Sequence, residues 1–202
     1  MNRFFVTRAG VALASLLGAA ALLAMTVLPT DFNQLLNQAE QIYKAQVVSV
    51  TSDWTGVGAN RHLATFVRLR VLESYRGAVA GEQTLEFFGG SKGARVQGIF
   101  GMPQFHTGDV EILFVRPSDH SFCPLVGVQH GRFRVVSSAS DKTERVFLHD
   151  GTPLKDVSRV GTSRENVARG GARQEIDPMP VADFVGQIRA GLKSRGLIPD
   201  AS

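Results

Sequence analysis

The segment Phe87–Val115 reads FFGGSKGARVQGIFGMPQFHTGDVEILFV, and its turn residues decide the fold class. It predicts a strand that ends in a glycine turn, a second short strand that runs to Phe100, and a corner at the Gly-Met-Pro that follows. A Thr-Gly-Asp turn then leads into the apolar run Val110–Val115, the best candidate for a strand buried on both faces. We therefore predict a mainly β protein whose other strands pair with this segment.

The glycines of this segment predict turns and bends. Gly89–Gly93 (GGSKG) does not fit a phosphate-binding loop, because its lysine precedes the last glycine and a strand follows where such a loop opens a helix. We expect Gly98 and Gly101 at sharp bends, so that Gly98→Ala costs stability and Ser91→Ala does not.

Asp109 and Glu111, which flank the start of the apolar run, could place a lone acid in a cleft. We expect instead that both cap a turn and face solvent.

Hydrophobic periodicity places the remaining elements. Alternation in the second strand, which starts at His62, puts the odd-numbered residues from Leu63 to Val71 on the core face. A helix is expected after an N-cap at Asp31 or Thr30. The other expected strands are residues 42–54, 83–88 and 145–149, and a hairpin made of 123–129 and 132–136.

The tail predicts an amphipathic helix. Its apolar residues recur at i, i+3, i+4, i+7 and i+11, and Gly196 is expected to stop it. A helix of about three turns is marginal alone, so its stripe must lie on something apolar, with the protein's own barrel preferred over a partner or a membrane. The stripe consists of Val181, Phe184, Val185, Ile188 and Leu192.

The N-terminus directs export. Met1–Arg8 carries two arginines and no acid before an apolar run over 11–28. A cleaved signal peptide is favoured, and a single-span membrane anchor is the alternative. The predicted location is therefore periplasmic or secreted, or anchored to the membrane by that run. The expected division is 1–30 for the signal or anchor, 31–153 for the β domain, 154–177 for a flexible linker and 178–202 for the C-terminal helix.

Charge and cysteine usage narrow the partners. The net charge is +4, with no basic stripe, which argues against nucleic acid. Cys123 is the one cysteine, so no disulfide can form within the chain, and we expect a buried small hydrophobe. The sharper alternatives are an intermolecular disulfide and a metal site shared by Cys123, His120 and His130.

No catalytic motif is found in the chain. It lacks His-Glu-x-x-His, Gly-x-Ser-x-Gly, Ser-x-x-Lys and a dinucleotide fingerprint, and its five histidines sit singly. No catalytic, cofactor-binding or metal residue is assigned, no cofactor is expected, and the chain is predicted not to be an enzyme.

An ordered set of short motifs carries a resemblance over residues 42–136. Val67-x-Leu69-x-Val71-Leu72-Glu73, Gly89-Gly90, Met102-Pro103-x-Phe105-x-x-Gly108-Asp109 and Gly131-x-Phe133-x-Val135 follow one another. The set resembles exported bacterial proteins of unknown function with a netrin-like, OB-type barrel similar to tissue metalloproteinase inhibitors. The resemblance implies a small closed or partly open OB-like β-barrel between the two helices. Inhibition in the animal family depends on an N-terminal cysteine that is absent here, so no functional residue is carried over.

Two function classes remain open. The first is an exported, non-catalytic binding module whose unknown protein partner lies in the cell envelope or outside the cell. The second is a hydrolase or metal-dependent enzyme with a dispersed site that uses His106, His120 or His130.

Overall fold

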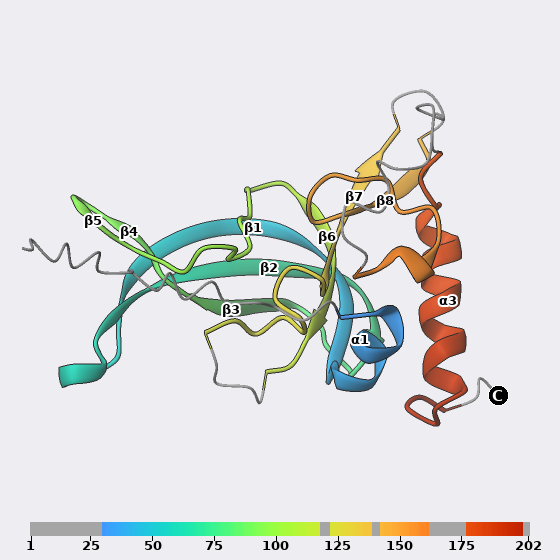
Figure 1. Ribbon diagram of the computed structural model, residues 1–202, viewed down its shortest axis with the longest axis horizontal. Coiled ribbons are helices and arrows are strands. Elements are labelled where there is room, and N and C mark those ends of the chain that lie inside the picture. The colour runs from blue at the N-terminus through green and yellow to red at the C-terminus, as the bar shows by residue number, and fades with distance from the viewer. Residues whose placement is uncertain (1–29, 118–121, 139–141, 162–176, 200–202) are drawn as a thin grey trace, which may run out of the picture.

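A computed structural model describes residues 30–117, 122–138, 142–161 and 177–199. The predicted mainly β architecture is confirmed: a long, bent sheet dominates the molecule, and a helix packs across one end of it (Figure 1). The predicted signal peptide or anchor, residues 1–30, lies outside the described part except for Thr30. Within that part, no helix combines the length and the apolar character needed to cross a membrane.

Six strands form one antiparallel sheet in the order β3-β2-β1-β6-β7-β8. A separate two-stranded hairpin, β4-β5, follows β3. The strands are β1 (Gln41–Thr55), β2 (His62–Arg76), β3 (Glu82–Phe88), β4 (Gly90–Lys92), β5 (Arg95–Gln97), β6 (Val110–Val115), β7 (Arg132–Ser137) and β8 (Glu144–Leu148).

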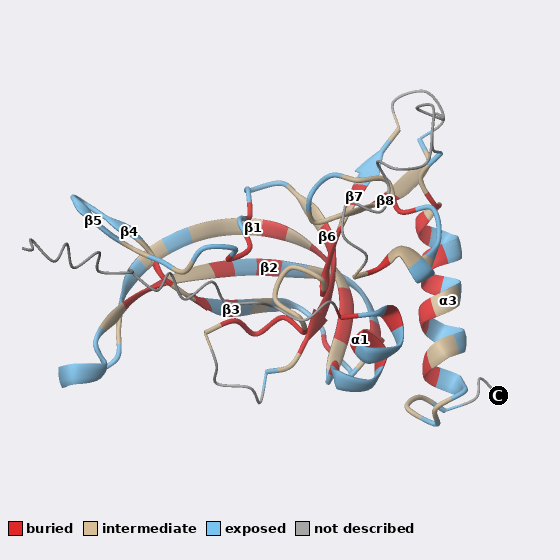
Figure 2. Cartoon of the chain, viewed as in Figure 1, coloured by how far each residue is buried: buried red, intermediate tan, exposed pale blue. Residues whose placement is uncertain are grey.

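The predicted alternation is confirmed in β2, and the predicted burial on both faces is confirmed in β6. Leu63, Val67 and Leu69 are buried in β2, and every residue of β6 after Val110 is buried (Figure 2). β6 lies between β1 and β7, so its side chains enter the core on both faces of the sheet.

The sheet is open, so the closed form of the predicted barrel is wrong. β3 and β8 are its two edges, and they are not paired with each other among the described residues. The reason lies in the chain after β8, which folds back over that edge: Leu154 N–H donates to Val146 O at 3.0 Å, and Val146 N–H donates to Met179 O at 2.9 Å. Segments from both sides of residues 162–176 thus occupy the edge that a barrel would use to close.

Both predicted helices form. α1 (Phe32–Gln38) starts at Asp31 with a capping box, in which Gln34 N–H donates to the Asp31 carboxylate at 2.8 Å. α3 (Val181–Lys193) buries its whole predicted stripe against the sheet. The short helices η1 (Gly58–Asn60) and η2 (Val157–Arg159) lie in connections.

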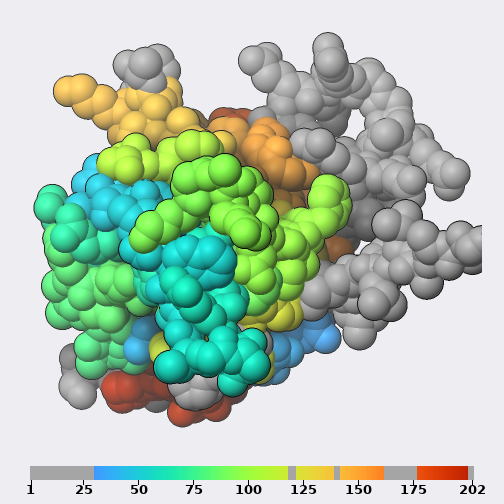
Figure 3. Space-filling view, turned by 90° about the vertical axis from the view of Figure 1, so that its left-hand side faces the viewer, coloured from blue at the N-terminus to red at the C-terminus, as the bar shows by residue number. Residues whose placement is uncertain are grey.

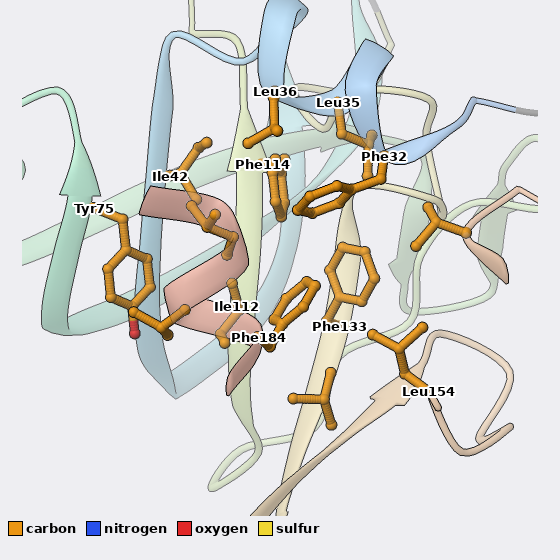
Figure 4. Packing of buried hydrophobic residues seen from close by; sticks show 14 of the residues in the cluster. Phe32, Leu35, Leu36, Ile42, Tyr75, Ile112, Phe114, Phe133, Leu154 and Phe184 are labelled. Atoms are coloured by element: carbon orange, nitrogen blue, oxygen red, sulfur yellow. The ribbon is translucent and has the colours of Figure 1, made fainter. Parts of the chain in front are cut away.

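Two hydrophobic clusters cover the two faces of the sheet. The helix-covered face joins α1 and α3 to β6, β7 and β8. At its centre, the rings of Phe32, Phe114, Phe133 and Phe184 pack against one another tilted or edge to face. The Phe133 and Phe184 rings lie 4.8 Å apart (Figure 4). The loop-covered face joins β1, β2 and β3 to Met102, Phe105, Cys123 and Leu125, which come from irregular segments.

Three segments differ from their predictions. Residues 123–129 form turns where a hairpin strand was expected, because β7 takes β6 and β8 as its partners. Of the predicted linker, Leu154 and Val160 are buried in the helix-covered face, and residues 162–176 lie outside the described part. The second short strand ends at Gln97, before Phe100.

Candidate functional site

The loop of residues 98–105 crosses the loop-covered face and is held at three points. In the space-filling view, the yellow-green surface that includes this loop lies above the teal turn between β1 and β2 (Figure 3). Leu63 N–H donates to Oε1 of Gln97, the residue just before the loop, at 2.8 Å. Two further hydrogen bonds reach the loop itself, Gln129 Nε2 to Gly101 O at 2.8 Å and the Arg132 guanidinium to Gln104 O. The backbone of this loop is therefore positioned by β2, by the turn before β7 and by β7 itself.

The loop carries one apolar side chain into solvent. Phe100 is fully exposed, whereas Met102 and Phe105 on the same loop are buried. A lone exposed apolar residue is ordinary on a protein surface. Phe100 is unusual because it also lines a cavity and sits on a loop fixed from several sides.

Two cavities flank the loop and share Ile99 and Met102 as lining residues. The larger, about 360 Å³, lies over the ends of β1, β2 and β3 and has polar groups from Ser52 and Thr65 in its wall. Thr65 Oγ1 donates to Gly89 O at 2.8 Å, so this hydroxyl is already engaged.

The smaller cavity, which we call the histidine cavity, has a volume of about 230 Å³. Its walls are mostly apolar, and two imidazoles provide the titratable groups. It is lined by residues 99–102, Phe122, residues 127–130 and His149.

The two imidazoles of this cavity touch each other. The His130 and His149 rings meet edge to face, with centroids 5.8 Å apart. His130 Nδ1 lies 3.2 Å from Gly127 O, and since a carbonyl only accepts, Nδ1 must carry the hydrogen. Burial lowers the pKa of His130, so the ring is uncharged at neutral pH and Nε2 is an acceptor.

Val128, in the wall of the same cavity, has a strained backbone. Its φ is +57°, a region that β-branched residues rarely adopt. The turn holds it there, because Val128 N–H donates to Leu125 O at 3.2 Å and His130 N–H donates to Gly127 O at 3.1 Å. Such strain concentrates at binding and catalytic sites, which supports a functional role for this turn.

A buried ion pair supports the far end of the loop. Arg132 binds Glu111 through two hydrogen bonds, Nε to Oε2 at 3.0 Å and Nη2 to Oε1 at 2.6 Å. The guanidinium also lies over the Phe105 ring, 4.3 Å from its centroid. Burial raises the pKa of Glu111, and Arg132 beside it acts in the opposite direction.

The expectation that Glu111 faces solvent is wrong, since its side chain is fully buried. A charged partner from β7 makes this possible, and the spacing of the two residues gives no local sequence signal. Asp109 is mostly buried as well: one oxygen lies 3.9 Å from Arg134 Nη2, and the other, Oδ2, has no hydrogen-bond partner among the described residues.

A third hollow, about 580 Å³, lies between α3 and the strands β1, β2 and β8. Two ion pairs at this hollow already use most of its charged side chains, Lys44 with Glu144 and Arg189 with Glu73 at 2.8 Å. We therefore interpret it as a solvent-filled gap between the helix and the sheet, because most of its charged groups are already paired with each other.

The histidines named from the sequence are not brought together. His106 is exposed beside Asp109, with Nδ1 to Oδ2 at 3.4 Å, and His120 lies outside the described residues. Within the described ranges, no three histidine, cysteine or acidic residues are placed to share a metal ion.

Cys123 is buried as expected, and burial raises the pKa of its thiol to about 11.

Sequence reasoning missed the pairing of His130 with His149 and the exposed Phe100. The two histidines lie in separate turns that the strand order brings together, so no spacing rule marks them. Phe100 carried a signal that could have been used: it is a large apolar residue between two glycines, in a segment without periodicity.

Comparison with known proteins gives one match. A glutathione synthetase of Synechococcus elongatus is 35% identical over 94 residues, which cover 42% of this chain. The chain spans about 28% of the length of that curated relative. No protein-family model matches the chain, and no solved structure matches it.

This match corrects one expectation from the sequence. The prediction that the chain is not an enzyme is contradicted, because the relative is an enzyme. The absence of short catalytic motifs was its basis, and such motifs do not report sites assembled across a fold.

Proposed function

We propose that the chain is an exported domain that binds a partner protein by receiving an apolar side chain of the partner beside the loop of residues 98–105. The observation that carries the proposal is the exposed Phe100 on a loop whose backbone is fixed, next to a mostly apolar cavity. Aromatic anchors on pre-positioned backbone are typical of the residues that dominate binding energy.

The volume of the histidine cavity favours a partner side chain over a free small molecule. Small-molecule sites usually enclose about 300–1,000 Å³ and bury most of the ligand. The histidine cavity has about 230 Å³ and opens beside Phe100, so it accommodates about one side chain while Phe100 packs on the surface around it.

The OB-like interpretation of the sheet belongs to the same proposal. It is supported by the β1-β2-β3 meander and by β6, which pairs with the first half of the long strand β1. OB-type domains bind along one face of the sheet and the neighbouring loops, and the loop of residues 98–105 occupies such a position. The netrin-like resemblance and export rest on the sequence alone, on the ordered motifs and on the basic, then apolar, N-terminus.

Selection of peptides displayed on phage tests the binding proposal. We expect the full chain to enrich peptides with apolar residues, and Phe100→Ser to lose them. Val57→Ser is the matched control, since Val57 is also highly exposed but lies in the turn between β1 and β2 and lines neither cavity. Binding that Phe100→Ser leaves unchanged would contradict the proposal.

A second candidate function is catalytic, and the match to glutathione synthetase favours it. Within the described residues, uncharged His130 is the group best suited to accept a proton, because Nδ1 is fixed by Gly127 O and the ring lines a cavity. An assay of glutathione formation by the purified chain, with His130→Ala as the comparison, tests this. Glutathione formation that requires His130 would support the catalytic function. No glutathione formation by the unaltered chain would rule it out.

A further inference from the structure

We propose that the histidine cavity receives a tyrosine side chain of the partner, whose phenol hydroxyl donates a hydrogen bond to Nε2 of His130. This inference rests on the proposed binding function and names the chemistry that the cavity recognises. It follows from three properties of the cavity: its size, its apolar wall and the acceptor nitrogen of His130.

The size fits one substituted aromatic ring. A closed apolar cavity of about 150 Å³ is enough to bind benzene. The histidine cavity, at about 230 Å³, has room for a ring with one further substituent and too little for most drug-sized ligands.

The wall suits the face and edge of an aromatic ring. Met102 contributes a thioether, which contacts aromatic rings favourably, and Phe122 and Phe100 contribute rings that can pack edge to face. Val128 is held in its strained conformation at the same wall, so the cavity keeps its shape before a ligand enters.

The polar feature of His130 is an acceptor. Gly127 O takes the hydrogen of Nδ1, and Nε2 makes no hydrogen bond to the described residues. A ligand without a donor would leave this nitrogen desolvated and unpaired, which costs free energy, whereas a phenol supplies the missing O–H. His149, the other imidazole of the cavity, packs edge to face on His130 and helps to orient the ring.

Two small probes isolate this hydrogen bond. We expect p-cresol, which has the tyrosine ring, to bind about 2- to 10-fold more tightly than toluene, measured by NMR titration of the full chain. The amide signals of Val128 and His130 should move most. Equal affinity for p-cresol and toluene would overturn the inference, as would shifts confined to residues away from the cavity.

A pair of variants tests the acceptor itself. His130→Leu should remove the preference for p-cresol while toluene still binds. Val57→Ser, which lies outside both cavities, should keep the preference. Far-ultraviolet circular dichroism and a thermal melt check that both variants fold. If His130→Leu does not fold, the comparison of p-cresol with toluene in the unaltered chain still tests the proposed hydrogen bond. A preference that persists in folded His130→Leu would refute the role of Nε2.

Peptides distinguish failure of this inference from failure of the binding proposal. A selected peptide with tyrosine should bind more tightly than its phenylalanine counterpart. If Phe100→Ser abolishes binding but the two peptides bind equally, the binding proposal holds and the tyrosine inference fails. If Phe100→Ser has no effect on either peptide, the binding proposal fails.

Discussion

The two faces of the sheet are covered by different kinds of structure. Helices α1 and α3 cover one face, and its buried cluster has four phenylalanine rings at the centre. The hydroxyl of Tyr75 in this cluster donates to the Glu73 carboxylate. Irregular loops cover the other face, which buries the Glu111–Arg132 ion pair and the Tyr43 hydroxyl, an oxygen with no hydrogen-bond partner among the described residues. The loop-covered face also carries both cavities that flank the loop of residues 98–105.

The two faces differ because helices and loops pack against a sheet in different ways. An amphipathic helix presents a regular apolar stripe that interdigitates with a sheet and satisfies its own backbone. A loop brings backbone polar groups, which need partners, and leaves gaps between its side chains. The helix-covered face therefore stabilises the fold, and the loop-covered face can hold a binding site.

The largest expected effect comes from the ion pair of the loop-covered face. Arg132→Met leaves the Glu111 carboxylate buried without its partner, so we expect a loss of about 3–5 kcal/mol in the free energy of unfolding at neutral pH. Urea denaturation measures it. Arg134→Met is the control, because Arg134 is partly exposed and only approaches Asp109 at 3.9 Å, and it should cost less than about 1 kcal/mol.

The loss of stability caused by Arg132→Met should depend on pH in a defined direction. Burial raises the pKa of Glu111 in the folded protein, so the folded state binds this proton more tightly than the unfolded chain does. The contribution of Glu111 is therefore favourable below its ordinary pKa and is lost as the pH rises through the raised value. Removing Arg132 raises the pKa of Glu111 further. The loss in the free energy of unfolding of Arg132→Met should therefore be smaller at about pH 4 than at pH 8. An equal deficit at both values would show that lost packing, not charge, dominates.

Truncation on each face compares the two covers directly. Ile112→Ala on the helix-covered face should cost about 3–4 kcal/mol, because the surrounding rings are fixed and a cavity remains. Met102→Ala on the loop-covered face should cost only about 2 kcal/mol, since the loop beside an existing cavity can collapse. Equal losses in urea denaturation would mean that the loops pack as rigidly as the helices.

The sequence was sufficient to predict the elements whose buried faces follow from a local hydrophobic period. Alternation in β2 and the stripe of α3 placed their core faces correctly, and the tail packs on the sheet as expected. The closed barrel failed because the segments around Leu154 and Met179 take one sheet edge, and nothing local in the chain announces that pairing. The burial of Glu111 failed for the same reason, since its partner lies in another strand.

Two glycines of the loop-covered face offer a smaller contrast. Gly98→Ala was expected to cost stability at a bend, but the space for a Cβ atom at Gly98 is open and its φ is not positive. At Gly89, φ is +92° and a Cβ would lie 2.7 Å from Gln97 O. We now expect Gly89→Ala to cost about 1–3 kcal/mol and Gly98→Ala to be neutral, with exposed Ser91→Ala as a second neutral control. Thermal melts of the three variants test this, and a large loss at Gly98 would restore the original expectation.

The smallest expected effect concerns Cys123, which lies under the loops with its side chain buried. Burial raises the pKa of its thiol to about 11, so almost no thiolate is present at pH 8, and the thiolate is the reactive form. Iodoacetamide should therefore modify Cys123 in urea but not in the folded protein at pH 8. Since the chain has no second cysteine, the thermal melt should be the same with and without reductant. Rapid modification in the folded state would mean that the loops over Cys123 open often, because a buried thiol reacts only when its cover moves away.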